Sequence, residues 1–229
     1  MNRLVLFDID GTLLDGGGVA ASAFLRALRE VYGTAGRRNG YSFGGKTDPQ
    51  IARDLLLREG VPPERIEEGL ARVWELYLER LRAECVPERV RLHPGVRELV
   101  EELHHRDDAV LGLLTGNLRE GARTKLTAAG LDFGWFAVGA YGSDHADRRE
   151  LPAIAMERAE RLLGRRFEGK EVVVIGDTPH DISCGEHLGV RTIAVATGSY
   201  SPAELAACGP DHLFPSLEHT GAVLGAIFE

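Results

Sequence analysis

The chain has 229 residues, 44% of them hydrophobic, which is enough for one large domain or for a core domain with a smaller insertion. Its formal net charge of −8 and the lack of a lysine- and arginine-rich run argue against a nucleic-acid partner, although a few local cations could still hold a small anionic substrate. No apolar segment approaches the length of a membrane span, so we expect no membrane partner. Cys85, Cys184 and Cys208 are too scattered for a disulfide framework or a zinc site, and they fit a reducing cytoplasm.

The first expected element is a buried strand, because residues 4–7 form a short run that is apolar on both faces. Asp8 and Asp10 follow it, and residues two apart in an extended chain face the same way. Two carboxylates at one point repel each other unless a cation or a shared proton relieves them, so we expect a divalent metal site with one carboxylate left for chemistry. The alternative is a polar turn at a strand end, with Asp10 and Gly11 forming the bend.

Residues 16–91 show helical patterns and no strand pattern. Apolar residues recur at helical spacing over 19–32, and further helices are expected over 48–59 and 63–84. The helix expected over 48–59 follows a polar, glycine-rich loop and is expected to begin with Asp48 as the N-cap and Pro49 at the first helical position. This helical segment interrupts the alternation of strands and helices in the rest of the chain.

That alternation resumes near residue 92. The expected strands cover 109–114, 135–140, 171–175, 191–196 and 211–214, and the expected helices cover 96–105, 118–129, 150–163, 182–188 and 217–227, with a short helix after 201–202. Alternating elements predict an α/β chain whose parallel, Rossmann-like sheet is covered by helices on both faces. We therefore expect a core domain of residues 1–15 and 92–229 and an inserted all-helical domain of residues 16–91.

Polar side chains follow several of the expected strands. In parallel sheets ligands bind beyond the carboxyl ends of the strands, so these side chains are expected to converge. They are Asp8 and Asp10, Thr115 and Asn117, the segment 144–149, and Asp177 and Asp181.

Four of these segments, in this order, resemble the motifs of the haloacid dehalogenase (HAD) superfamily. Residues 8–12 match the first motif, residues 114–117 the second and residues 176–181 the fourth, while Arg148 or Arg149 stands where the third usually has lysine or arginine. The chain is most similar to the phosphatase side of the family, of the phosphoglycolate-phosphatase type, with a helical cap inserted after the first motif. The resemblance implies Mg²⁺-dependent hydrolysis of a small phosphorylated metabolite.

The resemblance also implies roles for individual residues. Asp8 would be the nucleophile that forms an aspartyl-phosphate, and Asp10 would protonate the leaving oxygen and later deprotonate water. Asp8, the backbone carbonyl of Asp10, and Asp177 would bind Mg²⁺. Asp181 would support these ligands or exchange roles with Asp177.

The remaining motif residues would hold the phosphate. Thr115 and the amide of Gly116 would bind its oxygens, and Asn117 would cap the next helix, although simple helix capping is the alternative for Thr115 and Asn117. The third motif departs from the usual lysine before proline. Its spacing from the next proline favours Arg149, whereas an Asp-Arg-x-Glu-Leu form favours Arg148, which we prefer.

Residues 40–47 also satisfy the P-loop pattern G-x-x-x-x-G-K-T. A P-loop follows a buried strand and runs directly into a helix, and no strand is expected before this segment. In the resembling family such a loop lies in the cap, so Gly45 and Lys46 are candidate contacts for the substrate's leaving group. Two other functions share the motifs: a phosphomutase, and a non-hydrolytic protein that accepts phosphate on its aspartate. Either a monomer or a homodimer is compatible with the chain.

Overall fold

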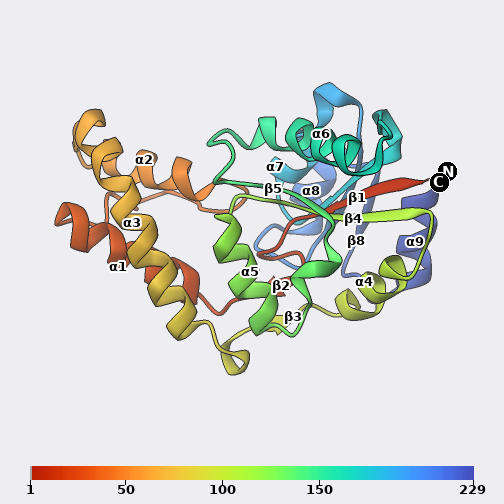
Figure 1. Cartoon of the computed structure of the whole chain (residues 1–229), viewed down its shortest axis with the longest axis horizontal. Helices are drawn as coiled ribbons and strands as arrows, with labels where there is room; N and C mark the ends of the chain where they lie inside the picture. Colours follow the sequence, from red (N-terminus) through yellow and green to blue (C-terminus); the bar gives the residue numbers. More distant parts are fainter. Residues whose placement is uncertain (1) are drawn as a thin grey trace.

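A parallel sheet of six strands forms the centre of the protein, for which a computed structural model describes residues 2–229 (Figure 1). The strand order is β5-β4-β1-β6-β7-β8, and every neighbouring pair is parallel. The bounds are β1 Arg3–Phe7, β4 Ala109–Thr115, β5 Val138–Tyr141, β6 Val172–Gly176, β7 Arg191–Val195 and β8 His212–Phe214. The expected α/β fold with a parallel sheet is thus confirmed.

Helices cover both faces of this sheet, because β1 presents apolar side chains in both directions. Val5 and Phe7 pack into one hydrophobic cluster with residues of helices α4 (Val96–His104), α5 (Arg119–Ala128) and α9 (Thr220–Phe228), whereas Leu4 and Leu6 pack into another with α6 (Leu151–Leu163). The other helices that follow the insertion are α7 Pro179–Ser183 and α8 Pro202–Ala207. Across residues 2–229, no helix combines the length and the apolar character that crossing a membrane requires.

Three helices, α1 (Val19–Tyr32), α2 (Asp48–Arg58) and α3 (Pro63–Glu84), lie beside the sheet rather than on its faces (Figure 1). α1 packs along α3, where the ring of Phe24 stacks on Trp74 with 6.1 Å between centroids.

The chain enters and leaves this helical segment through two short strands that the sequence did not predict. β2 (Leu14–Asp15) pairs antiparallel with β3 (Arg91–Leu92), so the expectation that residues 16–91 contain no strand is wrong at its last residue. Strands of two residues are too short to show a periodicity of their own.

Two expected elements differ from the structure in more than the position of their ends: one begins only after a 3₁₀ turn, and the other is divided into two pieces. The expected strand 135–140 begins only at Val138, because the Asp132 carboxylate accepts from the Gly134 amide at 2.8 Å and holds 133–135 in a 3₁₀ turn. The expected helix 182–188 is two pieces, α7 and a 3₁₀ turn over 186–188. α7 begins earlier than expected because Thr178 and Asp181 form a reciprocal capping box around its first turn.

Candidate functional site

Three carboxylates meet at the carboxyl edge of the sheet. β1 and β6 are neighbours with Phe7 beside Ile175, so Asp8 and Asp177 follow the two strands side by side. Asp181 comes from the first turn of α7, directly after β6. One oxygen from each of these three carboxylates lies within 4.8 Å of the other two, and all three side chains are buried. The register of the sheet therefore gathers acids from two distant parts of the sequence.

These acids accept hydrogen bonds from one guanidinium, from the hydroxyls of Thr12 and Thr178, and from the Thr178 amide. Nη2 of the buried Arg148 donates to Asp8 Oδ1 at 2.9 Å and also to Asp181 Oδ1. Thr12 Oγ1 donates to Asp177 Oδ1 at 2.9 Å. Among the described residues, one positive charge thus faces three buried carboxyl groups, and a further cation would balance them.

The charge imbalance is visible in the pKa values of the acids. Burial raises the pKa of Asp8 to about 7, although the Arg148 charge opposes the rise. Burial, reinforced by the charges of Asp181 and Asp8, raises the pKa of Asp177 to about 8. Carboxylate oxygens are the ligands that Mg²⁺ prefers, and a divalent ion beside them would return both groups to the ionised form. The donor set therefore fits a magnesium ion.

Two glycines leave room beside Asp177. A Cβ at Gly11 or at Gly198 would overlap the Asp177 carboxylate. Gly11 also adopts φ +87°, a left-handed conformation that other residues rarely adopt. Gly11 therefore forms a sharp turn after Asp10, and this turn brings the first motif close to the fourth.

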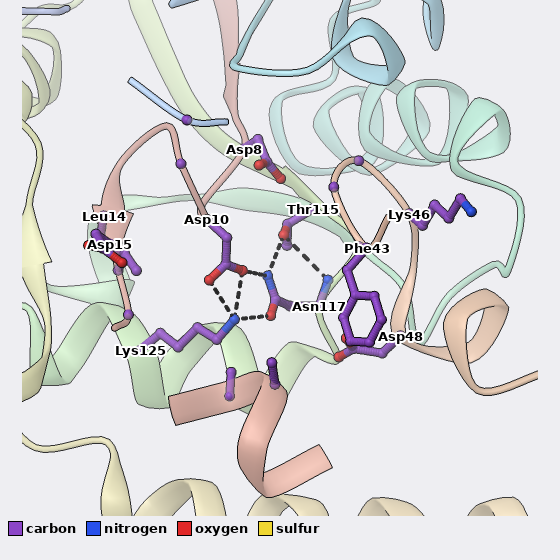
Figure 2. A pocket seen from close by; sticks show the side chains of 18 of the residues that line it. Asp8, Asp10, Leu14, Asp15, Phe43, Lys46, Asp48, Thr115, Asn117 and Lys125 are labelled. Atoms are coloured by element: carbon purple, nitrogen blue, oxygen red, sulfur yellow. Dashed lines mark hydrogen bonds and ion pairs between the residues drawn. The ribbon is translucent and has the colours of Figure 1, made fainter. Parts of the chain in front are cut away.

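Asp10 points into a different group of side chains from Asp8 (Figure 2). Lys125 Nζ donates to its two carboxylate oxygens at 2.8 and 2.6 Å and to Asn117 Oδ1 at 2.6 Å. Asn117 Nδ2 completes the ring with a 2.7 Å bond to Asp10 Oδ2. Partial desolvation favours the neutral acid, but the Lys125 charge and these hydrogen bonds outweigh it and hold the pKa of Asp10 below its ordinary value. Asp10 is therefore ionised and fixed in orientation.

Lys125 is a residue that the motif comparison missed. It is only 3% exposed and lies on the inner face of α5, one turn from the buried Ala122 and next to the buried Leu126. The sequence did contain a signal for it, because Lys125 stands at an apolar position of an amphipathic helix, and a buried lysine needs an acidic partner.

The second motif is held together by its own side chains rather than by a helix cap. Thr115 Oγ1 accepts from Asn117 Nδ2 at 2.7 Å. The expectation that Asn117 caps α5 is wrong, because the N-cap is Leu118, whose amide donates to Asp48 Oδ2 at 2.9 Å. The expected N-cap role of Asp48 is likewise wrong. Asp48 is the first residue of α2, and the Thr47 hydroxyl caps that helix, so the Asp48 carboxylate is free to join α2 to α5.

The two arginines of the third motif point in different directions. Arg148 is buried against Asp8, as described above, whereas the Arg149 side chain is 73% exposed and pairs with Asp147. Elsewhere in the segment 144–149, Asp144 pairs with Arg158 at 2.6 Å rather than with the site. Only Arg148 of this segment lines the cavity beside Asp8.

The loop before α2 contacts the core through its backbone. A Cβ at Gly45 would overlap Thr178 and His180, and a Cβ at Gly116 would overlap the carbonyl of Lys46. The Lys46 side chain points away from the carboxylates (Figure 2), with Nζ 3.7 Å from the centre of the Tyr41 ring. No strand lies between α1 and α2, so the local structure of a P-loop is absent from this part of the described chain.

A cavity of about 550 Å³ opens from the carboxylates toward the three helices. Asp8, Asp10, Thr115, Gly116 and Asn117 line it on the side of the sheet. α1, α2 and the loop between them line the opposite side.

Comparison with known sequences decides the family. A model of the family described as haloacid dehalogenase-like hydrolase matches residues 5–195, which include all four motifs. The chain belongs to this family. The resemblance read from the motifs is therefore confirmed, and the chain is a hydrolase by membership.

Individual relatives of this HAD-like hydrolase cover nearly its whole length. It is 29% identical over 222 residues to pyrophosphatase PpaX of Halalkalibacterium halodurans, with 96% of each chain covered. It is 26% identical over 218 residues to phosphoglycolate phosphatase of Vibrio vulnificus, covering 94% of this chain and 92% of the relative.

Solved structures share the fold of this HAD-like hydrolase. A hydrolase from Pseudomonas syringae superposes with a TM-score of 0.71 at 20% identity, with 98% of each chain covered. CbbY from Rhodobacter sphaeroides, solved in complex with phosphate, superposes with a TM-score of 0.67 at 22% identity, covering 96% of this chain and 97% of the other. At these identities the likeness shows the fold alone.

Proposed function

We propose that this HAD-like hydrolase is a Mg²⁺-dependent phosphatase that hydrolyses a small phosphorylated metabolite through an aspartyl-phosphate on Asp8. The observation that carries the proposal is the pairing of two acids with opposite surroundings in one cavity. Asp8 lies among other carboxylates and is paired with Arg148. Asp10 lines the same cavity and accepts hydrogen bonds from Lys125 and Asn117. Two carboxyl groups with different environments can take the separate roles of nucleophile and proton carrier.

In the first step a carboxylate oxygen of Asp8 forms a bond to phosphorus as the bond from phosphorus to the leaving oxygen breaks. Asp10, which takes up a proton when the negatively charged phosphate binds beside it, gives that proton to the leaving oxygen. In the second step Asp10, now ionised, takes a proton from a water molecule, which attacks phosphorus and releases Asp8 and inorganic phosphate. The ring with Lys125 and Asn117 stabilises Asp10 in this ionised form.

Mg²⁺ would be held by Asp8, Asp177 and the backbone carbonyl of Asp10, with Asp181 beside them. When bound, it would neutralise charge on the phosphoryl oxygens. Asp181 accepts from the Thr178 amide at 2.9 Å and from Arg148, so its carboxylate is held close to the proposed ligands.

The phosphate itself would be held by Arg148, Thr115 and the amide of Gly116. Arg148 lines the cavity beside Asp8 and is buried there, which puts its positive charge next to the proposed phosphoryl position. Arg149 takes no part in this proposal, because its side chain is exposed.

We further propose that residues 16–91 act as a cap domain over this site. The paired strands β2 and β3 form the connection to the core, and the loop before α2 meets the second and fourth motifs through Gly45 and Lys46. Closure of such a segment would exclude water from the phosphoryl group. We propose a cytoplasmic location as well, which the three free cysteines support.

The test is hydrolysis of p-nitrophenyl phosphate by the whole protein, with added Mg²⁺ and with a chelator. We expect turnover only with the metal. Asp8→Asn should reduce kcat by at least about a hundredfold, because an amide cannot replace a covalent nucleophile. Asp107→Asn is the matched control, since Asp107 is an exposed aspartate outside the site.

Trapping the intermediate separates the proposal from its alternatives. Acid quenching of a reaction with radiolabelled substrate should leave label on wild-type protein and none on Asp8→Asn. Label without release of inorganic phosphate would indicate a phosphate-accepting protein. Release only in the presence of an acceptor sugar, with the phosphoryl group returned to it, would indicate a phosphomutase.

A further inference from the structure

The cavity beyond the carboxylates has a mainly apolar far wall. Its volume, about 550 Å³, lies within the roughly 300–1,000 Å³ typical of pockets that enclose a drug-sized molecule. The apolar residues of this wall come from β2, α1, the following loop and α2. They are Leu14, Ala20, Ala21, Phe24, Phe43 and Ile51. In the proposed function a phosphoryl group and Mg²⁺ would occupy only the end of the cavity beside Asp8, so this wall would face the leaving group.

The aromatic members of the wall are held in place by packing. Phe24 is only 3% exposed, stacks on Trp74 and meets the edge of Tyr77 with 5.6 Å between ring centroids. Phe43 packs against Tyr41, with 5.8 Å between ring centroids. These rings form a fixed surface before any substrate enters, which favours burial of an apolar group.

Every cation that lines the cavity already has an acidic partner. Lys125 is bound to both oxygens of Asp10, and Arg148 is bound to Asp8 beside the phosphoryl position. Lys46 points outward, over Tyr41 and within 3.8 Å of an Asp54 oxygen.

The remaining charges in the cavity are negative. Asp15, from β2, and Asp48, from α2, both line it. A second anionic group on the substrate would therefore lie near these carboxylates and find no unpaired cation among the described residues, and an unpaired charge in such a site is costly.

Resting on the proposed phosphatase activity, we propose that the substrate is a monoester whose leaving alcohol is bulky, mainly apolar and free of a second acidic group. This differs from the substrates that give the pyrophosphatase and phosphoglycolate phosphatase relatives their names. Pyrophosphate and phosphoglycolate each carry a second anionic group and leave most of the apolar wall uncovered.

Three matched primary alkyl esters test the inference, because they have similar leaving-group chemistry. They are ethyl phosphate, 2-phenylethyl phosphate and 2-(4-carboxyphenyl)ethyl phosphate. We expect kcat/KM for the phenylethyl ester to exceed that for ethyl phosphate by about tenfold or more, the usual gain from burying a phenyl ring. The carboxylated ester should fall at least about tenfold below the phenylethyl ester. Pyrophosphate and phosphoglycolate should be poorer still.

Two cavity variants make the test specific to this wall. Ala21→Leu fills the cavity and should lower kcat/KM for the phenylethyl ester at least about tenfold more than for ethyl phosphate. Phe43→Arg adds a cation and should reverse the preference between the phenylethyl and carboxylated esters. Leu57→Ala is the control on α2, since Leu57 is 48% exposed and lies outside the cavity.

The outcomes separate this inference from the function on which it rests. Preference for phosphoglycolate, pyrophosphate or the carboxylated ester would overturn the inference and leave the phosphatase standing. Equal rates for the ethyl and phenylethyl esters, or an equal effect of Ala21→Leu on both, would overturn it as well. Failure to hydrolyse any ester, p-nitrophenyl phosphate included, would overturn the phosphatase proposal together with the inference.

Discussion

Lys125 and Asp10 form a two-oxygen ion pair, at 2.6 and 2.8 Å, although 115 positions separate them in the sequence. The lysine is buried, whereas the Asp10 side chain is 47% exposed and faces the cavity. The pair therefore fixes the aspartate at the cavity surface. We assign Lys125 a positioning role, since it touches Asp10 rather than the phosphoryl site.

Lys125→Met should lower kcat/KM for an alkyl phosphate about tenfold and change its pH profile. Removing the ammonium raises the pKa of Asp10, because the charge that holds this pKa low is lost. Because Asp10 must carry a proton to act as the acid, the alkaline limb of the kcat/KM profile should therefore move to higher pH. Lys125→Arg keeps the charge and should restore part of the rate. An unchanged profile in Lys125→Met, with a normal melting temperature, would contradict the assignment.

Asp10→Asn should affect substrates according to their leaving groups. A nitrophenolate departs without a proton, whereas an alkoxide needs one, so loss of the acid should cost an alkyl phosphate at least about tenfold more than p-nitrophenyl phosphate. The measurement is kcat/KM for both esters in wild type and variant. Equal losses would show that Asp10 does not protonate the leaving group.

Asp177→Asn should make the metal-free protein more stable at alkaline pH. The pKa of Asp177 is about 8 in the fold against an ordinary 3.8, so the wild type favours the protonated acid and loses stability as pH rises from about 4 through about 8. The amide cannot ionise and avoids this loss. The variant's advantage in unfolding free energy should therefore grow between about pH 5 and about pH 8, by about 1–3 kcal/mol.

Denaturant titrations in chelator measure this advantage. Burial also lowers the pKa of His93 and His180, but both proteins contain these histidines, so their contribution cancels in the difference. Mg²⁺ should then stabilise the wild type and leave Asp177→Asn nearly unchanged. An advantage in unfolding free energy that is constant with pH would argue against a buried acid with a raised pKa at this position.

Lys46→Ala tests whether the cap loop acts through this side chain. With Nζ over the Tyr41 ring and near Asp54, rather than toward the carboxylates of the site, we expect less than about a threefold change in kcat/KM for any ester, since partly exposed ion pairs contribute little. A loss of one to two orders of magnitude confined to the best substrate would instead support the leaving-group contact that the loop sequence suggested. Gly45 contributes through its backbone rather than through a side chain, because any side chain there would overlap Thr178 and His180.

Local patterns in the sequence were sufficient to predict the family, the α/β class and nearly every element of the core. Buried strands such as β1 are continuous apolar runs, and the polar residues that follow them mark the edge where ligands bind. The placement of Asp8 beside Asp177 follows from the same reasoning, since parallel strands end at a common edge. Elements of two residues, such as β2, carry no such pattern and were missed.

Only the tertiary structure decided which side chains meet within the site. Arg148 and Arg149 are adjacent in the chain, and the rotation of a 3₁₀ turn buries the first and exposes the second. By itself the sequence determined where the strands end, because strand formation depends on neighbouring residues. Whether Lys125 reaches Asp10 depends on how α5 packs against β1, and that packing is a property of the whole fold.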